Sequence, residues 1–167
     1  AAVSARSRVE AFALGTRLTR LTRELDIRDP DQALQRAADS VEDWSGGTRL
    51  GEGLRQFNDD WGARGMARGA VIVILSDGWD RGEPERLASE MARLSRVAHR
   101  IVWVNPLKAS DGYAPLAQGM AAALPYVDDF IEGHSLGALD RLSSILSSGS
   151  SGPVRSRSAS TPEEVTR

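Results

Sequence analysis

The spacing of apolar residues changes along this chain, and the changes divide it into strands and helices. Residues 70–75 (AVIVIL) contain five large branched residues in a row. Such a run without alternation is typical of a strand covered on both faces, so we expect it in the middle of a sheet. Further strands are expected at residues 8–14, 16–22, 100–104 and 126–131. The first two flank Gly15 and are expected to pair antiparallel at an edge of the sheet.

Helical spacing of apolar residues predicts the segments between the strands. Pro30 suits the first turn of a helix over residues 29–41, and Thr48 is well placed to cap a helix that continues to Trp61. Further helices are expected at residues 83–98, 114–124 and 135–146. Because strands alternate with helices, residues 1–147 are predicted to form an α/β domain with a mostly parallel sheet, an antiparallel edge strand and helices on both faces. Residues 148–167 are rich in Ser and Arg without periodicity, which predicts a disordered tail.

Composition excludes several classes of function. The 167 residues suffice for one domain, and a net charge of −2 gives no electrostatic case for binding nucleic acid or an anionic membrane. The chain has no cysteine, which excludes disulfides, thiolate nucleophiles and thiolate metal ligands. Its longest aliphatic run, residues 70–75, is far shorter than the ~20 residues of a membrane span. We therefore expect a cytoplasmic protein with no membrane span and no nucleic-acid partner.

Two oxygen-bearing side chains are expected at one edge of the sheet. Asp77 directly follows the strand at residues 70–75, and Thr48 lies in a glycine-bearing loop at a helix start. Ligands of open parallel sheets bind beyond the carboxyl ends of the strands, and hard oxygen donors there suit Mg²⁺. Two structural alternatives stay open. Thr48 can simply cap its helix, and Asp77 can simply brace the turn over residues 76–78.

The neighbours of these two residues are candidates for contact with a protein partner: Gly47, Gly78, Trp79 and Asp80. A tryptophan on a loop beside a hydrophilic site can anchor a partner, and equally its indole can pack on the following helix. His99 and His134 are isolated from other ligand-type residues and are expected to be structural. The adjacent carboxylates Asp128 and Asp129 diverge from each other, so we expect them to terminate an element rather than to act as a catalytic pair.

Longer stretches resemble the CoxE-like family of von Willebrand factor type A (VWA) domains. They are SGG followed by TRLGEGLRQF, then VIVILSDGWDRGEPERLASEMARLSRVAHRIVWVNPL, then GYAPLAQGMAAALPYVDDFIEGHSL. The resemblance covers roughly residues 9–146 and implies a binding module that is not an enzyme. It also implies a metal-ion-dependent adhesion site for Mg²⁺ or Mn²⁺, with an Asp-x-Ser-x-Ser loop after the first strand, a Thr and a later Asp. Thr48 matches the Thr, and Asp77 matches the later Asp.

The Asp-x-Ser-x-Ser part of the family pattern has no counterpart in this sequence. Ser4 and Ser7 are the nearest serines, and no Asp precedes them. The resemblance therefore implies that the first strand is missing from this chain, and in the family that strand lies centrally, between the strands that match residues 8–14 and 70–75. We expect an incomplete metal site that binds Mg²⁺ weakly, and a domain that is marginally stable or oligomeric because two strands lack a partner.

The sequence leaves three functions open. The resemblance implies an accessory protein that assists a MoxR-type AAA+ ATPase in the maturation of a molybdenum-containing CO dehydrogenase or a related metalloenzyme. The first alternative is a metal-assisted phosphohydrolase with Asp77 as nucleophile. Trp79 stands where such an enzyme needs a second Asp, and neither a GxSxG elbow nor a P-loop occurs. The second alternative is an inert, truncated VWA fragment.

Overall fold

Two separate sheets form in the part of the chain that this computed structural model describes, which is residues 8–41, 47–62, 64–106, 118–133 and 135–148. Strands β1 (Phe12–Leu14) and β2 (Leu18–Arg20) pair antiparallel. Strands β3 (Val71–Leu75), β4 (Arg100–Asn105) and β5 (Asp129–Glu132) form a parallel sheet in the order β3-β4-β5. The predicted α/β class, parallel sheet and antiparallel hairpin are confirmed. His134 and the predicted tail beyond residue 148 lie outside the described residues.

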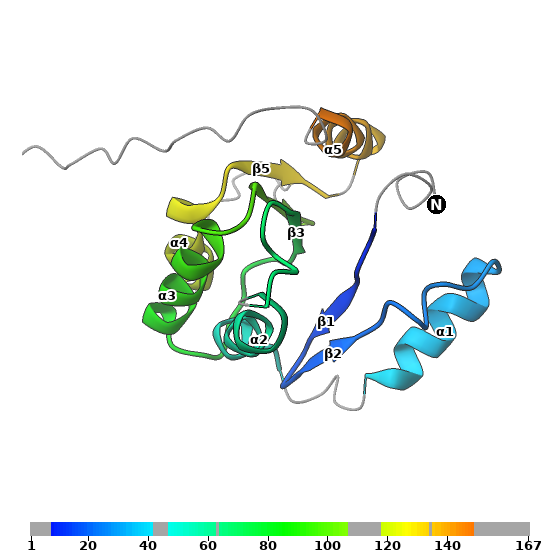
Figure 1. Cartoon of the computed structure of the whole chain (residues 1–167), viewed down its shortest axis with the longest axis horizontal. Helices are drawn as coiled ribbons and strands as arrows, with labels where there is room; N and C mark the ends of the chain where they lie inside the picture. Colours follow the sequence, from blue (N-terminus) through cyan, green and yellow to red (C-terminus); the bar gives the residue numbers. More distant parts are fainter. Residues whose placement is uncertain (1–7, 42–46, 63, 107–117, 134, 149–167) are drawn as a thin grey trace, which may run out of the picture.

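The two sheets do not pair with each other among the described residues. β1 bonds only to β2, and β3 bonds only to β4, so each has one edge without a hydrogen-bonded neighbour strand. Figure 1 shows the hairpin standing apart from the three-stranded sheet, with β1 on the side of β3.

β4, not β3, is the middle strand of the parallel sheet. Residues 101–105 are all buried, whereas Ile74 is the one buried residue of β3 and Leu75 is 74% exposed. The prediction that residues 70–75 occupy the middle of a sheet is therefore wrong for the described structure. Its physical reason is that an apolar strand is buried only when neighbours cover it, and β3 has such a neighbour on one side only.

The helices follow the predicted pattern with shifted ends. Asp29 caps the first helix by accepting hydrogen bonds from the backbone N–H groups of Asp31 and Gln32. The second helix ends at Phe57 and continues as a π-helical turn to Gly62, where one α-helix to Trp61 was expected. The elements are α1 (Pro30–Ser40), α2 (Leu50–Phe57) with η1 (Asn58–Gly62), α3 (Pro84–Ser95), α4 (Gln118–Ala123) with η2 (Leu124–Tyr126), and α5 (Leu136–Ser148).

Helices cover both faces of the three-stranded sheet, as Figure 1 shows. Ile101 and Trp103 of β4 belong to a core cluster that contains residues of α2, α3 and α4. Val102 and Val104 point to the opposite face and pack with Ile145 of α5. Fully burying such a side chain contributes ~1.5–3 kcal/mol, so β4 is the most strongly held strand.

Helix α2 is the element that connects the two sheets. The side chain of Leu14 in β1 lies directly against Gly53 of α2, where any side chain would collide with it. The ring of Phe12 contacts Phe57 edge-on at 5.3 Å between centroids and Trp61 at 5.1 Å. The hairpin is thus placed by α2 and η1, and the start of α2 in turn adjoins the loop that follows β3.

Candidate functional site

Strand β4 holds the loop that follows β3, residues 76–82, from one side. The indole Nε1 of the fully buried Trp103 donates a hydrogen bond to the carbonyl of Ser76 at 2.8 Å. The side-chain amide of Asn105 donates to the carbonyl of Asp77 at 3.4 Å, and the amide N–H of Ser76 donates to Val104 at 3.1 Å. Asn105 is itself fully buried. The backbone before and at Asp77 is therefore fixed by its neighbour strand.

Two short contacts within the loop set the direction of its side chains. The hydroxyl of Ser76 accepts a hydrogen bond from the N–H of Gly78, and Oδ1 of Asp77 accepts one from the N–H of Trp79 at 2.9 Å. Gly78 has φ +80°, and a side chain there would lie 2.7 Å from the end of Met120. Only glycine meets both conditions readily. The structural alternative for Asp77, bracing the turn, is thus present in the geometry, and it engages one of the two carboxylate oxygens.

The loop that carries Thr48 lies beside the loop that carries Asp77. The amide N–H of Arg81 donates to the carbonyl of Thr48 at 3.0 Å, and Oδ1 of Asp80 accepts from the N–H of Leu50 at 2.9 Å. The expectation that Thr48 caps α2 is wrong. The N-cap residue is Arg49, which makes no side-chain capping bond, and the carboxylate of Asp80 takes the first free N–H of the helix from outside.

Asp80 is turned inward and links the two loops. Its Oδ1 also accepts from the N–H of Gly82 at 3.0 Å, while its Oδ2 is buried and has no hydrogen-bond partner in the described structure. An aspartate that receives two backbone N–H groups stabilises the loop and the start of α2 together. Because its carboxylate faces the protein, Asp80 differs from Trp79, its neighbour in the loop.

Trp79 is directed to solvent. Its side chain is 70% exposed, so it does not pack on the following helix, which was the structural alternative. Leu75, at the end of β3, is also largely exposed. Large exposed apolar side chains beside a rigid polar loop are typical of surfaces that bind another protein.

The donors in this region suit a hard cation in kind but are few in number. Thr48 and Asp77 offer a hydroxyl and a carboxylate, the ligand types that Mg²⁺ prefers, from two adjoining loops. No group of three or more His, Cys, Asp or Glu side chains that could hold a metal occurs within the described residues. These two residues alone therefore do not make a complete site.

The remaining predicted residues lie away from this loop in the chain. Asp128 and Asp129 diverge, as expected, but Asp129 begins β5 and Asp128 directly precedes it, so they do not terminate an element. Asp128 accepts from the N–H of Ile101 at 2.8 Å, and Asp129 forms a two-bond ion pair with Arg100. His99 is half-buried, and its backbone N–H donates to Ala70.

Sequence reasoning missed the side-chain donors of β4. Trp103 was assigned only to a strand and Asn105 to the loop after it, although they fix the backbone around Asp77. The available signal was a polar residue at the carboxyl end of an otherwise apolar strand, at the sheet edge where ligands bind.

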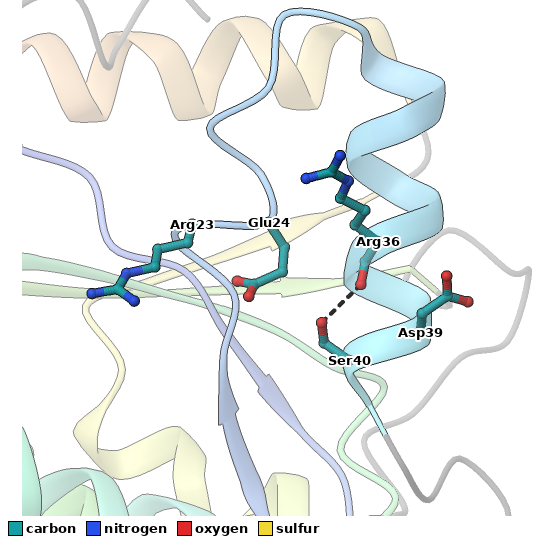
Figure 2. A pocket seen from close by; sticks show the side chains of 5 residues that line it. All are labelled: Arg23, Glu24, Arg36, Asp39 and Ser40. Carbon is teal, nitrogen blue, oxygen red and sulfur yellow. Dashed lines mark hydrogen bonds between the residues drawn. The ribbon is translucent and has the colours of Figure 1, made fainter.

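Two surface hollows in the structure involve other residues. One, of about 350 Å³, lies between the turn after β2 and helix α1. It is lined by Arg23, Glu24, Arg36, Asp39 and Ser40 (Figure 2). The other, of about 360 Å³, lies beside α2 and includes Arg49 and Glu52. Neither is lined by a residue of the 76–82 loop, so the loop is an exposed surface rather than the wall of either hollow.

Comparison with known proteins places the chain in a family. No helix among the described residues is long and apolar enough to cross a membrane. No curated protein and no solved structure gave a significant match. The family model described as "VWA domain containing CoxE-like protein" matches residues 1–139, which is most of the chain. This chain therefore belongs to the CoxE-like VWA family, and its α/β fold is a VWA module.

Proposed function

We propose that this chain is a non-catalytic protein-interaction module that assists a MoxR-type AAA+ ATPase in the cytoplasm. The task of the pair is the maturation of a molybdenum-containing CO dehydrogenase or a related metalloenzyme. The observation that carries the proposal is the 70% exposure of Trp79 on a loop whose backbone is held by β4 and linked to α2. A rigid loop with an exposed aromatic side chain binds a partner with little loss of conformational entropy.

The metal has a secondary place in this proposal. Thr48 and Asp77 would hold Mg²⁺ or Mn²⁺ in a domain that also supplies the Asp-x-Ser-x-Ser oxygens, and the metal would offer an open position to an acidic group of the partner. This chain has two of these donors, so we expect it to bind Mg²⁺ weakly. Calorimetric titration with Mg²⁺ tests this part, and tight binding that survives Asp77→Asn would contradict it.

The interaction itself is tested with the MoxR-type ATPase encoded in the same genome. Binding of the purified chain to the immobilised ATPase is measured with excess Mg²⁺ and with excess EDTA. We expect association, and we expect Trp79→Ala to weaken it by about tenfold or more, the effect of losing a central aromatic anchor. The matched control is Leu136→Ala, because Leu136 is similarly exposed but lies on α5. No association in either buffer, or equal losses in both variants, would refute the proposal.

A further inference from the structure

The 76–82 loop exposes the side chains of Trp79 and Arg81 and turns that of Asp80 inward. Asp77 and Asp80 accept hydrogen bonds from backbone N–H groups, as described above. The outward pair therefore combines an aromatic ring with a cation, the two side-chain types that contribute most often to the energetic centre of a protein interface.

Arg81 lies against the loop that contains Gly47 and Thr48. Its backbone N–H donates to the carbonyl of Thr48, and its side chain crosses the bare α-carbon of Gly47. A Cβ at position 47 would lie 2.6 Å from Cδ and Nε of Arg81 and 2.9 Å from Cζ. Gly47 also has φ +80°, which a side chain would disfavour. The absence of a side chain at position 47 is thus what lets the guanidinium lie there.

The guanidinium of Arg81 has no acceptor in the described structure. Two arginines of the following helix, α3, do have one. Arg86 pairs with Glu52 at 3.0 Å, and Arg93 pairs with Glu90 and Asp59 at 2.8 Å. Among the described residues, Arg81 has neither a hydrogen bond from its side chain nor an ion pair to any carboxylate, although Asp77 and Asp80 belong to the same loop. Its five N–H donors are available to another molecule.

We propose that Arg81 receives a carboxylate of the protein partner while Trp79 packs on an apolar side chain next to that carboxylate. The inference rests on the proposed function and specifies its partner as a segment that carries Asp or Glu beside an apolar residue. The planar guanidinium fits a carboxylate through two parallel hydrogen bonds. The contact involves no metal, so it persists in EDTA.

The experiment uses a displayed random heptapeptide library, selected on the purified chain in EDTA. We expect selected peptides to be enriched in Asp or Glu adjacent to an apolar residue. The selected peptide that binds most tightly is then synthesised together with a neutral control peptide, in which Asn replaces Asp or Gln replaces Glu. Wild-type protein should prefer the acidic peptide about tenfold, as a charge-assisted pair does over a neutral one.

Four variants test whether Arg81 causes the preference for the acidic peptide. Arg81→Gln should bind the acidic and the neutral peptide equally. Arg81→Lys should keep part of the preference, because the charge remains while the planar guanidinium with its paired N–H donors is lost. Gly47→Ala should lower the preference without removing the charge, and circular dichroism shows whether it folds. Arg96→Gln is the matched control, because Arg96 is an exposed arginine at the end of α3.

The outcomes separate this inference from the proposed function. Peptides without acidic enrichment, no selection on the wild type, or a preference that Arg81→Gln retains would each overturn the role of Arg81. Binding of the ATPase, measured as above, decides the proposed function independently. Loss of the preference in Arg81→Gln but not in Arg96→Gln supports the inference.

Discussion

Strands β3 and β4 have nearly the same apolar character but very different surroundings. β4 is buried from Ile101 to Asn105, whereas β3 is mostly half-buried and ends in the exposed Leu75. β4 has a hydrogen-bonded strand on each side, and β3 has one on a single side within the described sheet. The difference shows that neighbours, more than composition, decide how much a strand contributes to stability. It can be tested by substitutions in the two strands.

The largest expected effect is at the centre of β4. Trp103→Ala should lower the free energy of unfolding by about 3–5 kcal/mol, the usual cost of truncating a large buried aromatic residue. Leu75→Ala in β3 should lower it by less than about 0.5 kcal/mol because Leu75 is already exposed. Urea unfolding measures both.

A second variant keeps this test informative if Trp103→Ala does not fold. Trp103→Phe retains an aromatic ring but removes the donor to the Ser76 carbonyl, for an expected loss of about 1–3 kcal/mol. If Leu75→Ala cost as much as either Trp103 variant, the contrast between the strands would be wrong.

A matched pair of valines gives the next largest effect. Val73 of β3 and Val102 of β4 are register partners on the face that α5 covers. Val102 is fully buried, so Val102→Ala should cost about 2 kcal/mol from lost burial and the cavity it leaves. Val73→Ala should cost about half of that, because Val73 is only partly buried. Thermal or urea unfolding compares them directly, and equal costs would indicate that β3 is covered as fully as β4.

The hairpin should lose stability in acid, because Glu10 holds it through hydrogen bonds to its ionised carboxylate. Hydrogen bonds from the Thr22 hydroxyl and the Arg20 guanidinium lower the pKa of Glu10 from 4.5 to about 2. Because the folded pKa is depressed, this stabilisation is complete above pH 4.5 and is lost as pH falls from 4.5 towards 2.

The size of this contribution is about 1 kcal/mol, since the arginine partners are largely exposed to solvent. Unfolding of wild type and Glu10→Gln should therefore differ at neutral pH and converge in acid, as followed by urea titration at several pH values. Parallel pH profiles for the two proteins would exclude a role of Glu10 in holding the hairpin.

The smallest expected effect on stability is at the open edge of β3. Leu75→Lys should change the free energy of unfolding by less than about 0.5 kcal/mol but reduce self-association, because a charge on an edge strand opposes pairing with another chain. Light scattering at rising concentration measures self-association. Leu136→Lys, at a similarly exposed position on α5, serves as control and should not reduce it.

Much of the fold was predictable because local patterns determine it. The hairpin around Gly15, the helix that starts after Asp29 and the run of apolar residues in β3 are all legible in the sequence. The spacing of apolar residues did not show which strand has neighbours on both sides, although the resemblance implied an unpaired side for residues 70–75. That property depends on pairings between residues distant in the chain, such as Val73 with Val102.

The candidate site was predictable only in part for a related reason. The position of Asp77 after a buried strand and its match to the family motif pointed to the loop. The capping of α2 by Asp80 could not be foreseen, because it joins residues 30 positions apart. The position of the Arg81 side chain against Gly47 likewise depends on two loops that meet in space.

The close contact of α4 with the 76–82 loop limits which of their residues can be substituted. A side chain at Gly119 would lie 2.7 Å from the carbonyl of Gly78 and 2.9 Å from Cβ of Asp80, so the loop and helix leave each other no spare room. Substitution of Gly78 or Gly119 would displace the loop, whereas substitution of Trp79 or Arg81 would leave the loop backbone in place. We therefore expect the two outward residues to tolerate substitution without loss of folding, and the glycines behind them not to.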